Sequence, residues 1–393
     1  MAVRSKENFL VFGAPRIEED EIQELEAVMR SGWLGTGPRV AAFEHDFCRY
    51  RSAEHAVALS SCSAALHLSL LAAGIGSGDE VITTPLTFCA TVNSIIHAGA
   101  TPVLADIDPR TMNIDPEQVR ALLTDRTRAI VPVHFAGRPC EMDPLMEMAT
   151  QRGLKVIEDC AHAIETEYHG RSAGTFGDFG CFSFYVTKNI VTGEGGMVFT
   201  RREEDAARIK ILGLHGMTKD AWKRFGDEGY KHYYVVAAGF KYNMMDLQAA
   251  IGLKQLEKVD AYWRRRQVIW NRYCEAFAEL PLGLPAAPEA NTRHAHHLFN
   301  VLVDSERCGI SRDDFLNGMT AQGIGVGVHY LSLTEHPYYQ ETYGWKPEDT
   351  PHATRIGRQT VSLPISAKLS DRDVEDVIEA VCCVLPQRTA DVA

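Results

Sequence analysis

One lysine, Lys188, interrupts an otherwise apolar run at residues 181–196, CFSFYVTKNIVTGEGG, and three glycines follow it. Burying an unpaired ammonium is expensive, so a lysine at the end of a strand-like run either extends to water or acquires a lowered pKa and reacts with carbonyls. Gly193, Gly195 and Gly196 allow the backbone to turn tightly and to approach a ligand. The stretch therefore indicates a lysine held in a pocket. A lysine in a solvated turn is the open alternative.

A second polar group follows a β-branched run in LKVIEDCAHA, residues 154–163, which contains Asp159 and His162. Ligands of open α/β sheets bind at the carboxyl ends of strands, which makes Asp159 a candidate site residue. Two alternatives remain open. Asp159 could cap a helix running through Ala161 and Ala163, and His162 could be an ordinary helix histidine with its hydrogen bonds satisfied.

A third feature is the serine-rich turn that opens a helix in ALSSCSAALHLSLLAAGIG, residues 58–76. The free N–H groups of the first helical turn and the positive end of the helix dipole form an anion site suited to a phosphate, to which Ser63 adds a hydroxyl. A serine cap is the alternative, although Ser60, Ser61 and Ser63 together exceed what one cap needs.

These three features together are the parts that pyridoxal 5'-phosphate requires. They are a phosphate anchor, a carboxylate that keeps a pyridine nitrogen protonated, and a lysine that condenses with an aldehyde. A nicotinamide-dependent enzyme is disfavoured, because the turn SSCSAA lacks the glycine fingerprint of a dinucleotide site. The cysteines lack the paired spacing of a zinc site, so no metal is predicted.

At these residues the chain resembles the DegT/StrS-type sugar aminotransferases, which are fold type I pyridoxal-phosphate enzymes that act on nucleotide-linked keto sugars. The resemblance covers nearly the whole chain. Its segments are SGWLGTGPRVAAFE at 31–44, TTPLTFCATVNSIIHAGATPVLADID at 83–108, VHFAGRPCEMD at 133–143, IEDCAHA at 157–163, FSFYVTKNIVTGEGGMV at 182–198 and GFKYNMMDLQAAIGLKQLEK at 239–258.

The resemblance assigns catalytic roles to Lys188, Asp159 and His162. It implies that Lys188 forms the Schiff base, that Asp159 pairs with the pyridine nitrogen, and that His162 lies near the phenolic oxygen of the cofactor. Phe88 would stack on the ring, although an aromatic residue after a strand is usually part of the core.

The family's phosphate contacts fall on Ser63, the backbone of Ala64, Ser183, and Asn243 of a neighbouring subunit. The resemblance therefore implies a homodimer with shared active sites. Asn243 could instead cap a helix that begins near Met245.

Within the family the resemblance is strongest to the aminotransferases that form UDP-4-amino-4-deoxy-L-arabinose, including VDSERCGISRDDF at 303–315 and GIGVGVHY at 323–330. It implies ping-pong transfer of an amine from glutamate, which leaves as 2-oxoglutarate, to carbon 4 of a nucleotide-linked keto sugar. His329 and Tyr330 are candidate substrate-side residues, with packing as the alternative.

Two other functions stay open within this fold. One is a sugar dehydratase, although the dehydratase relatives carry histidine where this chain has Lys188. The other is a non-catalytic sensor or scaffold, since a fold does not fix a function. The intact set of Lys188, Asp159 and His162 counts against the scaffold.

Composition agrees with a cytoplasmic enzyme of this class. The 393 residues are sufficient for two domains, and the formal net charge of −12 argues against a nucleic-acid or anionic-membrane partner. No apolar run reaches membrane-spanning length, and the first residues lack the apolar segment of a signal peptide. The ten cysteines resemble reduced thiols in spacing and density.

The expected fold class is α/β: a fold type I pyridoxal-phosphate transferase with a mainly parallel, seven-stranded-type sheet and a small C-terminal α/β domain. Strand and helix signals alternate from about residue 56 to 200, which predicts a helix-covered parallel sheet. We expect a large cofactor-binding domain over 1–250, and a linking helix with a small domain over 251–393.

Shorter elements are predicted within this frame. A long amphipathic helix is expected from 243 to about 279. In the small domain, strands are expected at HHLFNVLVD and GVGVHY, and helices begin at Ser311 and Ser370. The segment 216–238 is expected to be a loop over the active site, and the tail from Gln387 to be disordered.

Overall fold

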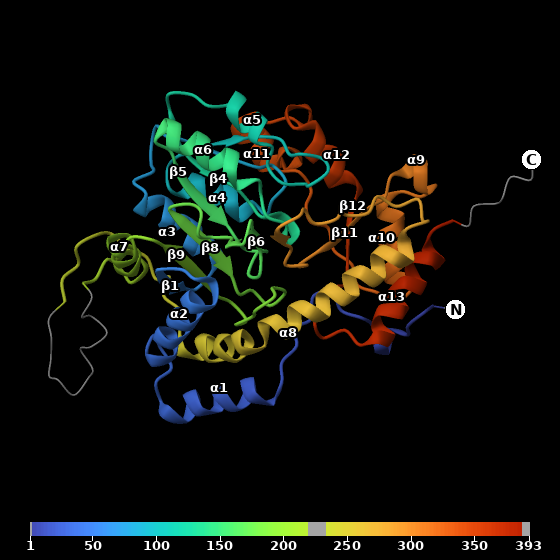
Figure 1. Cartoon of the computed structure of the whole chain (residues 1–393), viewed down its shortest axis with the longest axis horizontal. Helices are drawn as coiled ribbons and strands as arrows, with labels where there is room; N and C mark the ends of the chain where they lie inside the picture. The colour runs from blue at the N-terminus through green and yellow to red at the C-terminus, as the bar shows by residue number, and fades with distance from the viewer. Residues whose placement is uncertain (1, 219–232, 387–393) are drawn as a thin grey trace, which may run out of the picture.

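A seven-stranded sheet forms the centre of the larger part of the chain (Figure 1) in a computed structural model that describes residues 2–218 and 233–386. In spatial order the strands are β1 His55–Leu59, β9 Gly196–Thr200, β8 Phe179–Ser183, β5 Lys155–Asp159, β4 Thr127–Val131, β2 Glu80–Thr83 and β3 Thr101–Leu104. Strand β9 runs antiparallel to both of its neighbours, and the remaining pairs are parallel. The expected mainly parallel sheet is confirmed.

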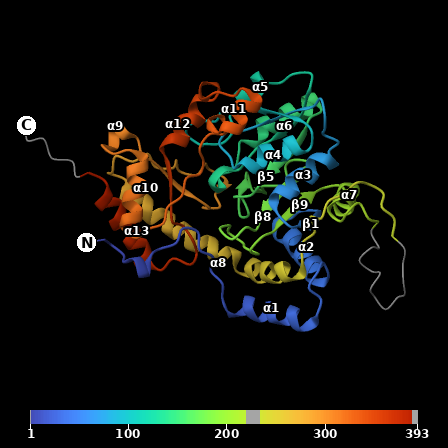
Figure 2. The ribbon, with the colours of Figure 1, turned by 180° about the vertical axis from the view of Figure 1, so that it is seen from behind.

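Helices cover both faces of the sheet, because its strands carry buried side chains on both sides. Ile157 and Val198 pack with α3 in one core cluster, whereas Val156 and Ile130 pack toward α6 on the opposite face. Both views show the sheet between these helices (Figures 1 and 2). The helices of this part are α1 Glu19–Ser31, α2 Pro38–Arg51, α3 Cys62–Ala72, α4 Cys89–His97, α5 Pro116–Ala121, α6 Met142–Arg152 and α7 Glu203–Gly213.

The long helix α8, Asp246–Phe277, runs from beside the sheet to the C-terminal elements (Figure 1). Its first half packs against α1 and α2, and its last turns carry Trp270, Tyr273 and Phe277 into the C-terminal core. The amphipathic helix predicted after residue 243 is thereby confirmed. The predicted domain boundary at residue 250 falls inside α8 and stays a prediction.

The C-terminal elements include a two-stranded antiparallel sheet formed by β11 Phe299–Leu302 and β12 Thr360–Leu363. The helices are α9 Ser305–Cys308, α10 Arg312–Ala321, α11 Pro337–Tyr343, α12 Pro351–Gln359 and α13 Asp371–Val384. Ser311 and Ser370 cap α10 and α13 with their side chains, as predicted. Arg4 forms an ion pair with Asp373 at 2.7 Å, which holds the N-terminal segment against α13.

The strand predicted at GVGVHY is wrong. Residues 325–330 form no strand; Gly327 exchanges two backbone hydrogen bonds with Ser362 of β12, and Gly325 donates one to the carbonyl of Leu10. A Cβ at Gly325 would lie 2.9 Å from that carbonyl oxygen, so the backbone at Gly325 passes unusually close to the backbone at Leu10. This close approach replaces the regular hydrogen-bond ladder of a strand. Strand β12, which the sequence analysis did not anticipate, is the partner of β11 instead.

Three short strands, β6 Glu167–Tyr168, β7 Arg171–Ser172 and β10 Thr292–Arg293, form a separate small sheet. Most of the expected loop over 216–238 and the tail from Gln387 lie outside the described residues. At the base of the loop, Met217 pairs with Val235.

No helix in the described ranges has the length and apolarity needed to cross a bilayer. All ten cysteines are free.

Candidate active site

Two neighbouring parallel strands, β5 and β8, end beside each other at the carboxyl edge of the sheet. Asp159 ends β5 and pairs in register with Cys181 of β8, so the buried Ser183 lies just beyond it. The loop from β8 to β9 carries Lys188, and it is closed by hydrogen bonds from Phe184 N–H to the Gly195 carbonyl (2.9 Å) and from Thr192 N–H to the Phe184 carbonyl (2.8 Å). The order of the strands therefore brings a lysine and a carboxylate to one edge.

Lys188 has an amine that is free to react. Within residues 2–218 and 233–386 the amine forms no ion pair or side-chain hydrogen bond. Burial lowers the pKa of Lys188 to about 8, and nearby Cys62 and Asp159 oppose this shift. At pH 7 about one lysine in ten is then neutral, against roughly one in three thousand for an ordinary lysine. Burial thus gives Lys188 the lowered pKa that the sequence analysis expected of a lysine removed from water.

Asp159 is almost fully buried, at 4 % exposure, and its carboxylate is only partly satisfied. One oxygen accepts a hydrogen bond from the Thr91 hydroxyl at 2.8 Å, and the other accepts from Ala161 N–H at 3.1 Å. Burial raises the pKa of Asp159, and these two hydrogen bonds oppose the rise. No helix follows Asp159, since residues 161–165 form turns, so the alternative of a helix cap is wrong. A cationic N–H donor would compensate the buried charge.

His162 is held in one tautomer by two hydrogen bonds. Its Nδ1 accepts from Ala136 N–H at 3.3 Å, so its proton lies on Nε2, which donates to the Tyr330 hydroxyl at 3.1 Å. Burial lowers the pKa of His162 well below its usual value, and the positive charge of Lys188 contributes. His162 lies in the turn region after β5, so the alternative of an ordinary helix histidine is also wrong.

Aromatic rings line the same region. The Phe88 side chain is 58 % exposed, which excludes the alternative of a core position, and its ring centre lies 6.0 Å from that of Tyr330. Phe88 immediately precedes α4, whose residue Thr91 bonds Asp159. His329 bonds the Ser362 hydroxyl at 2.8 Å and contacts the Phe12 ring, and burial lowers its pKa to about 4. Tyr330 therefore lies in the site, with His329 beside it.

The N-terminus of α3 approaches the site closely. Ser61 caps this helix by accepting a hydrogen bond from Ala64 N–H at 3.1 Å, and Ser63 in the first turn is exposed. A Cβ at Gly196, the first residue of β9, would lie 2.4 Å from the Ser61 carbonyl, so only glycine allows this approach. The expected anion site retains the Ser63 hydroxyl, whereas Ala64 N–H is already occupied by the cap.

Asn243 lies beside the end of β1 in the same chain, where its backbone pairs with that of Leu59. Its side chain donates to the Thr36 hydroxyl and accepts from the Lys241 amine, both at 2.7 Å. Helix α8 is capped at Met245, so Asn243 is not the helix cap that the sequence left open. Its proposed reach into a partner's site stays a prediction.

The arrangement fits pyridoxal 5'-phosphate. An unpaired amine, a buried carboxylate with spare acceptor positions, an exposed aromatic ring and the first turn of a helix converge at one edge of the sheet. Bound there, the cofactor would supply an aldehyde and an electron-accepting ring. Lys188, Asp159, Phe88 and Ser63 are the residues that would hold it.

The sequence analysis missed four polar residues behind the site, namely His297, Asn189, Glu165 and Arg266. His297 packs its ring 4.4 Å from that of His162 and bonds Asn189 at 2.9 Å. Asn189 in turn bonds Glu165, which pairs with Arg266 of α8. These partners are distant from one another in sequence. The one local signal that could have pointed to them is that Asn189 directly follows Lys188.

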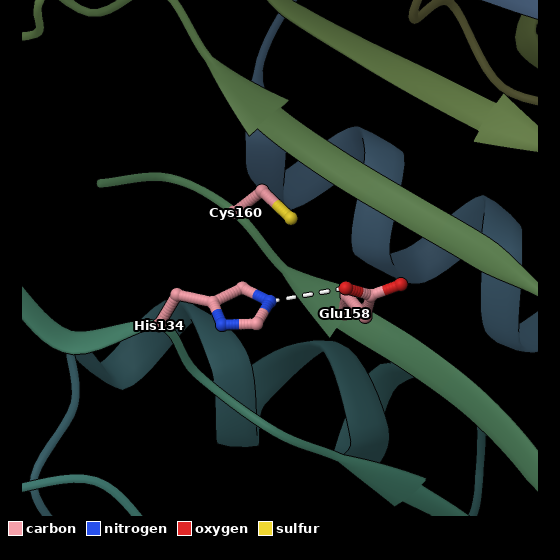
Figure 3. A group of neighbouring side chains, drawn as sticks. All are labelled: His134, Glu158 and Cys160. Carbon is pink, nitrogen blue, oxygen red and sulfur yellow. Dashed lines mark hydrogen bonds and ion pairs between the residues drawn. The ribbon is translucent and has the colours of Figure 1, made fainter. Parts of the chain in front are cut away.

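A second buried group, His134, Glu158 and Cys160, lies at the end of β5 (Figure 3). Glu158 accepts hydrogen bonds from Gly174, Phe176 and Gly177 N–H, each at 2.7 Å, and pairs with His134 at 3.1 Å. These four bonds use its acceptor positions, so the group anchors the loop 174–177 and is explained without an ion.

Fold and site together define a pyridoxal-phosphate enzyme of fold type I. The profile of the DegT/DnrJ/EryC1/StrS aminotransferase family matches residues 15–382. The chain belongs to this family of pyridoxal-phosphate-dependent sugar aminotransferases, as the sequence predicted.

Individual relatives agree over nearly the full length. The chain is 48 % identical over 380 residues to the spore coat polysaccharide biosynthesis protein SpsC of Bacillus subtilis, which covers 96 % of this chain and 98 % of SpsC. Spr1654 of Streptococcus pneumoniae, solved in its PMP form, has a TM-score of 0.89 at 32 % identity and covers 95 % of this chain and 98 % of its own. DesI, solved with its TDP-sugar product, has a TM-score of 0.85 at 33 % identity. The match covers 98 % of this chain and 94 % of the DesI chain.

Proposed function

We propose that the protein transfers the amino group of glutamate to carbon 4 of a nucleotide-linked keto sugar. The atoms balance over two half-reactions: glutamate leaves as 2-oxoglutarate, whose keto oxygen comes from one water, and the carbonyl oxygen of the sugar leaves as one water. The observation that carries the proposal is the unpaired, half-buried amine of Lys188 beside the buried carboxylate of Asp159. The neutral amine is the form that serves this chemistry, and the lowered pKa of Lys188 raises its share at pH 7 to about one in ten.

Lys188 takes the central role in both halves. Its Nζ removes the proton from the α-carbon of glutamate and later delivers one to the sugar carbon. Asp159 would hold its charge against the pyridine nitrogen, and His162, whose Nε2 proton is held by the Tyr330 hydroxyl, would lie beside the cofactor ring. Phe88 covers the ring face, since an aromatic side chain left 58 % exposed can gain further contact from a flat ligand.

The phosphate contacts in this proposal are Ser63, Ala64 and Ser183 of one chain and Asn243 of a second. Ala64 N–H would have to be shared with the Ser61 hydroxyl that it now bonds. The active protein is accordingly a homodimer, and we place it in the cytoplasm, where nucleotide-linked sugars are made.

His329 and Tyr330 are proposed as substrate-side residues, because both enter the site from the C-terminal part of the chain. A TDP-sugar product is named in the structure of DesI, and polysaccharide biosynthesis is named for SpsC. These relatives support a nucleotide-linked sugar as the acceptor. We propose a UDP-linked 4-keto pentose, the precursor of UDP-4-amino-4-deoxy-L-arabinose, as the first acceptor to test.

The test starts with purified protein loaded with pyridoxal 5'-phosphate. Glutamate should bleach the visible band of the lysine-bound cofactor and release 2-oxoglutarate. Adding the UDP- or TDP-linked 4-keto sugar should restore the band and yield one amino sugar per 2-oxoglutarate, measured by chromatography with mass detection. A protein that releases deoxysugar without consuming glutamate would be a dehydratase, and one that takes up no cofactor would contradict the proposal.

A further inference from the structure

Two buried threonines, Thr87 and Thr91, lie four positions apart at the start of α4, and we term them the threonine pair. Their hydroxyl oxygens are 2.8 Å apart, and the Thr91 hydroxyl lies 2.8 Å from Oδ2 of Asp159. Both side chains are at most 3 % exposed. The chemistry described so far gives a role to Asp159 but none to the threonine pair.

The protons of the threonine pair point toward Asp159 when that carboxylate is ionised. An ionised carboxylate can only accept, so the Thr91 hydroxyl donates to Oδ2. A hydroxyl has one proton, so Thr91 must accept in its contact with Thr87, and Thr87 donates. The two hydroxyl dipoles are therefore aligned in series, which strengthens the bond to the carboxylate.

The Thr91 hydroxyl does not follow the usual pattern of a helical threonine, which bonds a backbone group of its own helix. Ser94 of α4 shows that pattern, since its hydroxyl donates to the Ala90 carbonyl at 2.7 Å. The Thr91 hydroxyl instead crosses to Asp159 at the end of β5, 68 positions away in sequence. A bond to an ionised carboxylate is stronger than one to a neutral carbonyl. Thr91 thus serves the carboxylate rather than its own helix.

Both oxygens of Asp159 are held in place. Ala161 N–H donates to Oδ1 at 3.1 Å, and Thr91 holds Oδ2. A carboxylate bonded at both oxygens is restrained from rotating about its last bond, so the remaining lone pair of each oxygen keeps a fixed direction. Ala161 belongs to the same turn as Asp159. Thr91 is therefore the contact that fixes the carboxylate relative to another element of the fold.

Helix α4 is itself held by the C-terminal part of the chain. The Tyr339 hydroxyl donates to Oδ1 of Asn93 at 2.7 Å. Leu333 N–H donates to the Pro85 carbonyl at 3.0 Å, just before the threonine pair. These contacts fix both sides of the turn that carries the pair, so Asp159 is held from a rigid support.

The contact with Thr91 also affects the charge of Asp159. Burial raises the pKa of Asp159, and the bond from Thr91 opposes this rise more than Ala161 N–H or the charge of Lys188 does. The other titratable groups that face Asp159 come from the surrounding strands, loops and helices. They are His134 after β4, Cys62 of α3, Cys140 before α6, Cys160 after β5, Cys181 of β8 and Tyr330 of the C-terminal part.

We propose that the threonine pair positions Asp159 for the cofactor. Thr91 holds the ionised carboxylate so that a lone pair stays directed to the pyridine N–H, and Thr87 orients the Thr91 hydroxyl. The inference rests on the proposed function. Both threonines act through Asp159, so they are positioning residues. Phe88 lies between them in sequence, and one turn would therefore place both the cover of the ring and the carboxylate at its edge.

The first test uses the apoprotein and needs no activity. NMR of side-chain-labelled aspartate, with the Asp159 signal assigned by its loss in Asp159→Asn, would give the pKa of this carboxyl. Thr91→Val should raise it by about one pH unit or more, because the bond to the charged form is lost. Thr91→Ser should keep it near the native value. An equal pKa in Thr91→Val and the native protein would overturn the proposal.

Thr83→Val is the matched control for this titration. The Thr83 side chain is fully buried, and its hydroxyl donates to the Val131 carbonyl at the same distance of 2.8 Å. It should leave the pKa of Asp159 unchanged. If Thr83→Val moves that pKa as far as Thr91→Val does, the effect is general loosening of the fold, and the proposal fails. If Thr91→Val does not fold, Thr91→Ala removes the same hydroxyl and decides in its place.

The second test uses the loaded enzyme. Thr91→Val should lower kcat by about tenfold, with KM for the keto sugar within about twofold of native, because Thr91 acts on the charge opposite the ring. Thr91→Ser should restore kcat. Thr87→Val should lower kcat by about threefold, since the Thr91 donor remains. A loss that serine does not rescue, or a larger loss for Thr87→Val than for Thr91→Val, would contradict the proposal.

The two tests separate this inference from the proposed function. A protein that takes up no pyridoxal 5'-phosphate, yet shows a Thr91-dependent pKa of Asp159, would refute the aminotransferase proposal and leave the control of Asp159 by Thr91 in place. Normal amination by Thr91→Val, with an unmoved pKa of Asp159, would refute the role of the threonine pair alone.

Discussion

The Tyr330 hydroxyl lies 3.1 Å from Nε2 of His162, which joins the C-terminal part of the chain to the turn after β5. Since Ala136 N–H already bonds Nδ1 of His162, the ring donates from Nε2 and the tyrosine oxygen accepts. The two rings are also nearly parallel, at 16°. This contact orients the imidazole from a segment 168 positions away in sequence.

Tyr330→Phe should lower kcat/KM by about fivefold, because it removes one acceptor worth about 1 kcal/mol while keeping the ring. Steady-state kinetics with the keto sugar and with glutamate would measure the loss. Tyr338→Phe is the matched control, since Tyr338 is 54 % exposed and lies outside the site. Equal rates for Tyr330→Phe and the native enzyme would show that the contact does not orient His162.

Condensation of the apoprotein with pyridoxal 5'-phosphate should accelerate as the pH rises through about 8. The neutral amine is the reactive form, and burial lowers the pKa of Lys188 to that value. Stopped-flow absorbance between about pH 6 and pH 10 would follow the reaction. Lys188→Ala should form no lysine-bound band, whereas Lys368→Ala, at an exposed position, should behave as native. A midpoint near the value of an ordinary lysine would contradict the burial argument.

Asp159→Asn should slow the enzyme and stabilise the apoprotein at neutral pH. The folded-state pKa of Asp159 is raised by burial, so the folded state holds this proton more tightly than the unfolded state does. The stability that the protonated form contributes is lost as the pH rises from the unfolded-state pKa of Asp159 through its raised folded-state pKa. At pH 7 the buried ionised carboxylate therefore destabilises the folded state, and asparagine removes that destabilisation. Loss of the charge opposite a pyridine nitrogen should reduce kcat by about 10- to 100-fold.

Urea denaturation of the apoproteins at about pH 7 and about pH 4 would check the stability claim, with the advantage of the variant smaller at the lower pH. Asp125→Asn is a suitable control, because Asp125 is exposed. A variant less stable than native at neutral pH would show that the hydrogen bonds from Thr91 and Ala161 outweigh the burial of the charge.

The sequence predicted the parts of the site that are encoded locally. Lys188, Asp159 and the first turn of α3 each stand at the end of a recognisable strand or the start of a helix, and parallel strands deliver their ends to one edge. The strand at GVGVHY was predicted wrongly because its pairing is decided by distant neighbours, Leu10 and Ser362. Alternation of residue types carries no information about such contacts.

The polar residues behind the site, namely Asn189, His297, Glu165 and Arg266, could not be predicted for the same reason. Asn189 and His297 are 108 positions apart, and Glu165 and Arg266 are 101 apart. In the sequence HAHHLFN the histidine that faces the site cannot be told from its neighbours, because only the packing of residues 294–298 on the 135–137 turn selects it. Helix α8, which supplies Arg266, was predicted, but not which of its faces meets Glu165.

Glu158→Gln should destabilise the protein by about 3 kcal/mol, because the side-chain amide would point N–H groups at backbone donors that now bond a carboxylate. Urea denaturation would measure the change against Glu348→Gln, an exposed control.

A chelator tests whether the group of His134, Glu158 and Cys160 only anchors the loop 174–177. If it does, exhaustive treatment with a chelator should change neither the denaturation midpoint nor the amination rate. A chelator-sensitive midpoint that returns on adding a divalent cation would instead show that His134, Glu158 and Cys160 hold a metal. The folded state would then owe its stability to an ion rather than to the three backbone N–H groups.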